Sequence, residues 1–268
     1  VFLVIAVTVV FAGLSGGPMA AILGLRRPSQ AGWVMLGASA LARAVARLFK
    51  ENGQEIVCID ANPDHCMEAA GDCTRVIYGN GLQSRYLLRA EIDARRGALA
   101  LTQNDEVNFL FAGKVKEETR EVALYAVINS DTASLTPQIL HQDGVGVLFA
   151  APVDVDVWNR RINARRVHLQ RWQRRKAESE DQAAGPLLAG YPGSGLLAAA
   201  RLRSGMVMPV GDGMNFKAGD EVLIFVFEAE IKAVATFLDQ AGWEWRETID
   251  KEDFSTSVCH LEPSSQRV

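Results

Sequence analysis

A turn of small residues follows the first apolar run of the chain, in the segment "VMLGASALARAVARLF". The GxGxxG fingerprint of dinucleotide-binding turns has glycine at three positions, where this chain has Gly37, Ser39 and Ala42. Such a turn brings a pyrophosphate onto the N–H groups at the start of a helix. The hydroxyl of Ser39 adds a hydrogen-bond donor, and Ala42 keeps the helix close to the strand. The segment therefore predicts a phosphate-binding turn that keeps one of three glycines.

An aspartate ends the second apolar run, "EIVCI", 23 residues after Gly37. An acid at this position accepts hydrogen bonds from the ribose hydroxyls of an adenosine. No arginine follows Asp60 directly, which favours NAD over NADP. The segment "DANPD" leaves a second interpretation open, in which Asp60 only caps the next helix.

Short apolar runs alternate with helical patterns between residues 32 and 150. Leu41, Val45, Leu48 and Phe49 recur at helical spacing, and Gly53 is a stop signal. We expect strands over 32–36, 55–59, 75–78, 98–101, 121–128 and 144–150, and helices over 39–53, 64–70, 83–90 and 105–116. Strands that alternate with helices need crossover connections. The pattern therefore predicts an α/β fold with a Rossmann-like, doubly wound parallel sheet.

The composition is that of a globular protein, because 49% of the 268 residues are hydrophobic and 22% are charged. The net charge of -4 and the pI near 5.7 exclude a general nucleic-acid binder, which needs a basic surface to displace counterions. The four cysteines form no CxxC pair, and their spacing fits neither a zinc site nor a compact disulfide framework. We expect reduced thiols, no metal and no nucleic-acid partner.

The N-terminal stretch over 1–25 carries no charge, and Arg26 and Arg27 follow it directly. Glycines and a proline at 16–18 would break a helix, and a helix over 1–15 reaches only about 22 Å against a hydrocarbon core of about 30 Å. We expect the truncated last transmembrane helix and exit segment of a longer protein of the inner membrane. The arginine pair then places the chain after about residue 26 in the cytoplasm. A buried helix or strand of a soluble fold is the alternative.

The segment after Pro152 carries eight basic residues between Arg160 and Lys176. We expect a basic, amphipathic connecting helix with a hinge over 153–184, whose charged face either contacts anionic lipid or is only solvated. Beyond it, "FKAGDEVLIFVF" predicts a turn that enters a buried strand, and "EAEIKAVATFL" predicts an amphipathic helix. These elements predict a small α+β domain over 185–245, followed by a flexible tail over 246–268.

Several pieces of the first domain resemble the RCK/TrkA N-terminal domain, which regulates potassium channels, potassium uptake systems and cation/proton antiporters. These pieces are "VMLGASALARAVARLF", "IVCIDANPDHC", "VIYGNGL", "LALTQNDEVNFLFAGKVKEE" and "VGVLFAAPVD". The resemblance covers 31–152 and implies a site for NAD(H) or another adenine nucleotide. The chain departs from the family at Ser39 and at Asn80, where the family often has an acid. The site residues that the resemblance implies are Gly37, Ala38, Ser39, Ala42, Asp60, Ala61, Asn80, Thr102 and Asp105.

The segments on either side add to this resemblance. "VTVVFAGLSGGPMAAILGLRRP" is similar to the last transmembrane helix and exit segment of bacterial antiporters of the cation:proton antiporter superfamily. Residues 185–245 are similar, more loosely, to the RCK/TrkA C-terminal domain. This order implies the cytosolic regulatory tail of a sodium or potassium/proton antiporter, which senses a nucleotide and gates transport. We also expect a homodimer and a membrane transporter region upstream in the same protein.

Two other functions share these features. A soluble regulatory subunit of a Trk-type potassium uptake system would have no membrane region upstream. An NAD-dependent oxidoreductase would need an acid or base that positions a hydride. His141, His168 and His260 fall in an expected loop, the connecting helix and the tail, respectively. We therefore expect no enzyme activity, and no hydride transfer with small alcohols or hydroxy acids.

Overall fold

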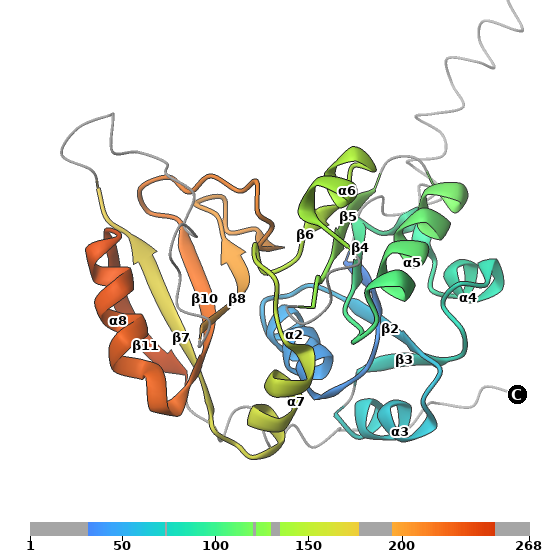
Figure 1. Cartoon of the computed structure of the whole chain (residues 1–268), viewed down its shortest axis with the longest axis horizontal. Coiled ribbons are helices and arrows are strands. Elements are labelled where there is room, and N and C mark those ends of the chain that lie inside the picture. Colours follow the sequence, from blue (N-terminus) through green and yellow to red (C-terminus); the bar gives the residue numbers. More distant parts are fainter. Residues whose placement is uncertain (1–31, 73, 120–121, 130–134, 177–194, 250–268) are drawn as a thin grey trace, which may run out of the picture.

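Two lobes lie side by side in the protein (Figure 1). The computed structural model describes residues 32–72, 74–119, 122–129, 135–176 and 195–249. The expected membrane segment, the hinge after residue 176 and the tail after residue 249 lie outside the described residues. Within the described ranges, no helix is both long enough and apolar enough to span a membrane.

The first lobe is a six-stranded sheet in the order β3-β2-β1-β4-β5-β6, and every neighbouring pair is parallel. Its strands are β1 (Trp33–Leu36), β2 (Ile56–Asp60), β3 (Arg75–Tyr78), β4 (Gly97–Ala100), β5 (Ala123–Ala126) and β6 (Gly146–Val147). All residues of β1 and β4 are buried, as expected for a sheet covered on both faces. The predicted Rossmann-like sheet is confirmed. Its order reverses between β1 and β4, which is where such sheets bind ligands.

Helices connect these strands in the places that the sequence predicts. They are α2 (Ala40–Glu51), α3 (Pro63–Gly71), α4 (Ser84–Arg89) and α5 (Asp105–Glu118), with a short 3₁₀ turn, η1 (Ile92–Ala94). A further helix, α6 (Pro137–Gln142), replaces the loop that was expected around His141. The Thr136 side chain accepts a hydrogen bond from the Ile139 N–H, and Pro137 takes the first helical position. Both are start signals for a helix, so this expectation was wrong for a reason visible in the sequence.

The second lobe is an antiparallel sheet in the order β11-β7-β10-β8-β9. Its elements are β7 (Val167–Arg174), β8 (Gly195–Arg201), β9 (Val207–Pro209), β10 (Glu221–Phe227), η3 (Glu228–Glu230), α8 (Ile231–Gln240) and β11 (Trp243–Ile249). The predicted turn before β10 is held by Asp220, whose carboxylate accepts from the N–H groups of Lys217 at 2.8 Å and Arg203 at 3.1 Å. Helix α8 covers the outer face of this sheet, and α2 and α7 (Val155–Asn163) lie between the two sheets (Figure 1).

The single connecting helix expected over 153–184 is wrong beyond α7. The chain turns at Arg165, which has a left-handed φ of 56°, and continues as strand β7. Successive side chains of β7 point to opposite faces of the sheet. Leu169 therefore packs in the core between the lobes, and Trp172 packs in the core under α8. His168 therefore lies in a strand. At the other end of the lobe, β11 extends to Ile249, so the first four residues of the expected tail are also part of the sheet.

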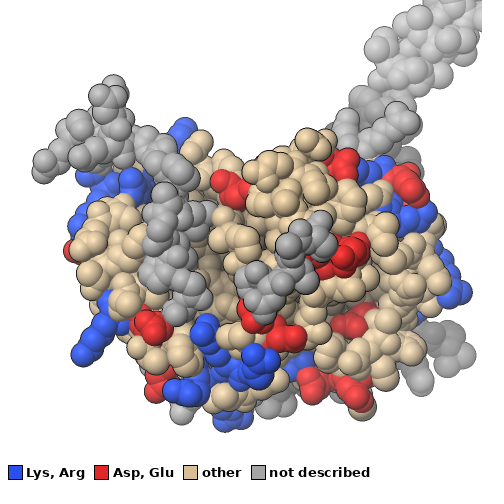
Figure 2. Space-filling view, viewed as in Figure 1, with Lys and Arg blue, Asp and Glu red and all other residues tan. Residues whose placement is uncertain are grey.

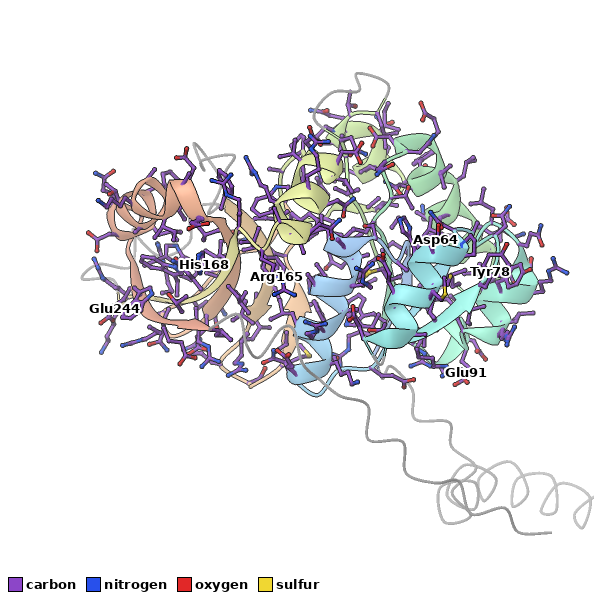
Figure 3. All side chains as sticks on the ribbon, turned by 90° about the horizontal axis from the view of Figure 1, so that it is seen from below. Asp64, Tyr78, Glu91, Arg165, His168 and Glu244 are labelled. Carbon is purple, nitrogen blue, oxygen red and sulfur yellow. The ribbon has the colours of Figure 1, made fainter. Side chains whose placement is uncertain are left out.

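The basic residues of this segment consequently do not line one helical face. On β7, Arg171 pairs with Glu247 at 3.0 Å, and beyond the strand Arg175 pairs with Asp239. The exposed basic residues that remain close together are at the end of α7 and in the turn after it, where Figure 2 shows Lys and Arg side chains gathered. Figure 3 shows Arg165 in this turn, between the two lobes. Lipid contact stays a prediction, and it now rests on this turn.

The two lobes share one apolar core. Trp158 of α7, Leu169 of β7 and Phe225 of β10 belong to the same buried cluster as Trp33 and Leu41 of the first lobe. The main chain also joins the lobes, because the Phe149 N–H donates to the Val210 carbonyl at 2.8 Å and Leu148 forms a bridge with Gly211. The two lobes are therefore joined by a shared core and by main-chain contacts as well as by the chain that connects them.

Candidate functional site

The turn after β1 requires glycine at its first position. Gly37 has a φ of +103°, a conformation that residues with a side chain rarely adopt. A Cβ at this position would lie 2.5 Å from the carbonyl oxygen of Leu101, directly after β4. The Gly37 N–H donates to the carbonyl oxygen of Ile59 at 2.9 Å. The turn is thus fixed against both neighbouring strands.

Ser39 is the N-cap of α2, but its hydroxyl does not cap the helix. The residue is 8% exposed, and its Oγ is buried with no hydrogen-bond partner among the described residues. A buried hydroxyl left unpaired costs about 1–3 kcal/mol, so it calls for an explanation, such as a bound ligand or an ordered water. The hydroxyl lies at the positive end of a twelve-residue helix, where an anion would be stabilised.

Asp60, at the end of β2, is bonded to the same turn. Its Oδ2 accepts from the Ala38 N–H at 2.7 Å, and its Oδ1 accepts from the Asn62 N–H at 2.8 Å. His65 Nδ1 lies 3.1 Å from Oδ2. The N-cap of α3 is Asn62, whose side chain accepts from the Asp64 N–H, so the interpretation of Asp60 as the cap is wrong. The carboxylate is instead held beside the phosphate-binding turn.

The remaining predicted site residues surround this turn at different depths. Thr102 follows β4 beside Gly37, and its N–H and hydroxyl both donate to the Asn108 carboxamide. Ala42 is fully buried on α2, Ala61 is exposed directly after Asp60, and Asn80 accepts from the Leu82 N–H after β3. The described structure therefore brings Gly37, Ala38, Ser39, Asp60 and Thr102 together, with Ala61 and Asn80 at the margin.

Asp105 has a different environment from the other predicted site residues. It is fully buried, and its Oδ1 accepts from the Asn129 main-chain N–H at 2.9 Å and from the Asn129 side chain at 2.8 Å. Its carboxylate thus ties the start of α5 to the segment after β5. In this position Asp105 shapes the loops at the carboxyl edge of the sheet.

Residues of α7 complete this edge, and the sequence pattern does not indicate them. The Leu41 N–H, in the first turn of α2, donates to Asn159 Oδ1 at 2.9 Å. The Val155 N–H donates to Asn129 Oδ1 at 3.4 Å, and Gln103 donates to Asp156. These contacts join positions far apart in the chain. The only local signal was the connecting helix expected over 153–184, and this signal does not identify the partners of its residues.

The two cysteines beside this edge are poor nucleophiles. Burial raises the pKa of Cys58, on β2, to about 12, so its thiol is protonated at neutral pH and a poor nucleophile. Burial also raises the pKa of Cys66, whose Sγ donates to the Asp60 carbonyl oxygen. The described residues contain no cluster of three or more histidines, cysteines and acids that would hold a metal.

A hollow of about 440 Å³ lies away from the turn, at the seam between the lobes. Its lining includes Tyr125, His141 and Asp212, and His141 Nε2 pairs with Asp212 Oδ2 at 2.6 Å. Asp212 Oδ1 also accepts from the Val147 N–H at 3.0 Å. This region joins the lobes and is separate from the predicted nucleotide site.

Comparison with known proteins finds similarity over the first lobe. Residues 33–149 match the TrkA-N domain. The chain is similar to the TrkA-N domain of the inner membrane protein ybaL from Escherichia coli, with 10% identity, a TM-score of 0.40, and coverage of 50% of this chain and 94% of that one. It is also similar to the GsuK channel bound to NAD, with 15% identity, a TM-score of 0.39 and coverage of 92% of this chain and 47% of that one.

The chain therefore spans about half of the GsuK channel chain. A search of curated proteins finds no match. The identities and scores of the solved structures are too low to indicate a shared ligand. The domain match agrees with the parallel strand order and with the turn after β1. The first lobe therefore has a Rossmann-like fold, and residues 33–149 of it match the TrkA-N domain.

Proposed function

We propose that the chain is the nucleotide-sensing cytosolic tail of a sodium or potassium/proton antiporter, and that NAD(H) or another adenine nucleotide binds at the turn after β1. The observation that carries the nucleotide site of this proposal is the buried, unpartnered hydroxyl of Ser39 at the N-terminus of α2. Gly37 and Asp60 support it, because they supply the tight turn and the acid that dinucleotide sites need.

Each part of the turn has a role in binding. The phosphate groups would lie at the first turn of α2, where N–H groups and the Ser39 hydroxyl provide donors. The Asp60 carboxylate, held by the Ala38 N–H, would accept from the ribose hydroxyls. Its negative charge would also disfavour a ribose that carries a phosphate. The residues present thus fit an adenine nucleotide without a 2′-phosphate.

Regulation requires that the ligand favour one arrangement of the protein over another. Helix α7 is the element suited to this, because it contacts the loops of the site at one end and the second lobe at the other. Its Arg161 guanidinium lies 4.3 Å from the centre of the Phe227 ring, at the end of β10. Binding near α2 would therefore be transmitted to the second sheet through α7.

The membrane context is part of the same proposal and rests on the sequence. The uncharged stretch over 1–25, followed by two arginines and a TrkA-N domain, is the order that a transporter with a regulatory tail would have. In this proposal the chain is a homodimer at the inner membrane, it senses and does not catalyse, and the turn after α7 faces anionic lipid. Co-sedimentation of the protein with anionic and with neutral vesicles would test the lipid contact.

Ser39 offers the direct test of nucleotide binding. We expect Ser39→Ala to weaken binding about ten-fold while raising the free energy of unfolding by about 1 kcal/mol, because it removes a buried hydroxyl that has no partner in the free protein. Isothermal titration of the full chain with NADH, NAD, AMP and ATP measures the first effect, and urea unfolding measures the second. Ser204→Ala is the control: this serine lies in an exposed turn, where its hydroxyl accepts a long hydrogen bond from the Met206 N–H at 3.5 Å, so binding should not change and stability should change by less than about 0.5 kcal/mol. If none of the four nucleotides produced heat, the proposed nucleotide site would be refuted and the domain would have a structural role only.

A further inference from the structure

At the N-terminus of α2, a side chain already accepts a hydrogen bond from one of the N–H groups proposed to bind phosphate. Leu41 is the second residue of this helix, and its N–H has no partner within the helix. That N–H donates instead to Asn159 Oδ1, at 2.9 Å, from a residue 118 positions later in the chain. Leu41 is fully buried, so this hydrogen bond satisfies a donor that water does not reach.

Helix α7, which carries Asn159, is seated on the carboxyl edge of the parallel sheet at two more places. Gln103, after β4, donates to Asp156, and the Val155 N–H donates to the Asn129 side chain, after β5. Trp158, which is 3% exposed, anchors the same helix in the core between the lobes. The seated helix thus contacts the loops after β4 and β5 as well as α2.

The seated α7 and a bound phosphate would both accept a hydrogen bond from the Leu41 N–H. A phosphate oxygen that accepts from the Leu41 N–H would have to replace Asn159 Oδ1 there. Asp156, one turn earlier on α7, adds a negative charge on the same side of the site. The Ser39 hydroxyl has no hydrogen-bond partner while α7 is seated. This is a second observation that points to a ligand at this turn.

We propose that the hydrogen bond between Asn159 and Leu41 is a latch, and that a nucleotide phosphate and the seated α7 exclude each other at the N-terminus of α2. This inference rests on the proposed nucleotide site and adds how that site is coupled to the second lobe. Arg161 and Arg166, farther along the chain, both lie over the Phe227 ring, at 4.3 Å and 5.1 Å. Release of α7 at the site therefore moves an element that holds the second sheet.

Substitutions at Asn159 test the latch because they act in opposite directions. Asn159→Ala removes the acceptor, so the state with α7 seated loses one hydrogen bond. Nucleotide affinity should therefore rise about five-fold. Asn159→Asp places a charged acceptor at the positive end of α2, so α7 is held more tightly and affinity should fall about five-fold. Asn163→Ala and Asn163→Asp, at the exposed end of α7, are matched controls and should leave affinity unchanged.

The measurement is isothermal titration of the full chain with NADH and with ATP, together with amide hydrogen exchange. Nucleotide should protect the first turn of α2 and speed exchange in α7. Equal affinity for wild type, Asn159→Ala and Asn159→Asp would overturn the latch and leave the nucleotide site standing. Protection of α7 by the nucleotide would also overturn it. Absence of binding in all three proteins would overturn both proposals, whereas binding to Asn159→Ala alone would support the latch.

Discussion

Alanine at position 37 is expected to lower the free energy of unfolding by about 3 kcal/mol or more. The backbone there has a φ of +103°, which costs about 1–3 kcal/mol for a residue with a side chain. The new Cβ would lie 2.5 Å from the Leu101 carbonyl oxygen, and main-chain atoms of a buried sheet do not move aside cheaply. Urea unfolding of Gly37→Ala, followed by circular dichroism, measures the loss.

The same substitution in α5 provides the control. Gly113 lies on an exposed helical position with no atom within 4 Å of an added Cβ, and its φ is not positive. Gly113→Ala is therefore expected to stabilise the protein by about 0.5–1 kcal/mol, because alanine favours the helix. If both variants changed stability in the same direction and by similar amounts, the close approach of Gly37 to the strand β4 loop would be refuted.

Removal of the Trp158 side chain is expected to cost about 3–5 kcal/mol, the range for a large buried aromatic residue. Trp158 is 3% exposed and packs in the cluster that both lobes share. Its loss would leave a cavity beneath α7, so the two lobes would unfold at lower urea and in separate steps. Unfolding curves of Trp158→Ala, recorded by circular dichroism and by tryptophan fluorescence, measure both effects.

Trp245→Ala removes the same side chain from the surface. Trp245 is 53% exposed on β11, so the loss there should be below about 1 kcal/mol. Comparison of the two variants separates the effect of the shared core from the effect of losing any tryptophan. A loss at Trp158 as small as that at Trp245 would show that α7 does not hold the lobes together.

Most elements of the first lobe were predictable because each carries its own local signal, whereas α6 was expected as a loop. Leu41, Val45 and Phe49 repeat at helical spacing and are all buried on α2, and the apolar runs before and after them became β1 and β2. Local patterns do not predict the structure where one segment fits both a helical and a strand periodicity. The segment with Leu169 and Trp172 is basic enough to suggest a solvated helix, yet its alternation suits a strand between two cores, and the tertiary context selects the strand.

The candidate site was predictable in its residue types and not in its contacts. Spacing along the chain placed Gly37 and Asp60 at the ends of neighbouring strands, and the structure bonds the Asp60 carboxylate to the turn that begins at Gly37. Spacing does not distinguish the partly buried carboxylate of Asp60 from the fully buried one of Asp105, whose partner Asn129 lies 24 residues away. Asn159 lies 118 residues from its partner, so only the folded chain reveals it.

The bridge between Leu148 and Gly211 also affects the behaviour of the protein in solution. Strand β6 is the last of the parallel sheet, and an unpaired outer strand invites pairing with other chains. The turn of the second lobe after β9 occupies the main chain just beyond β6, through Leu148 and Phe149. The second lobe therefore covers this edge of the parallel sheet, and it disfavours pairing of the main chain there with a strand of another molecule.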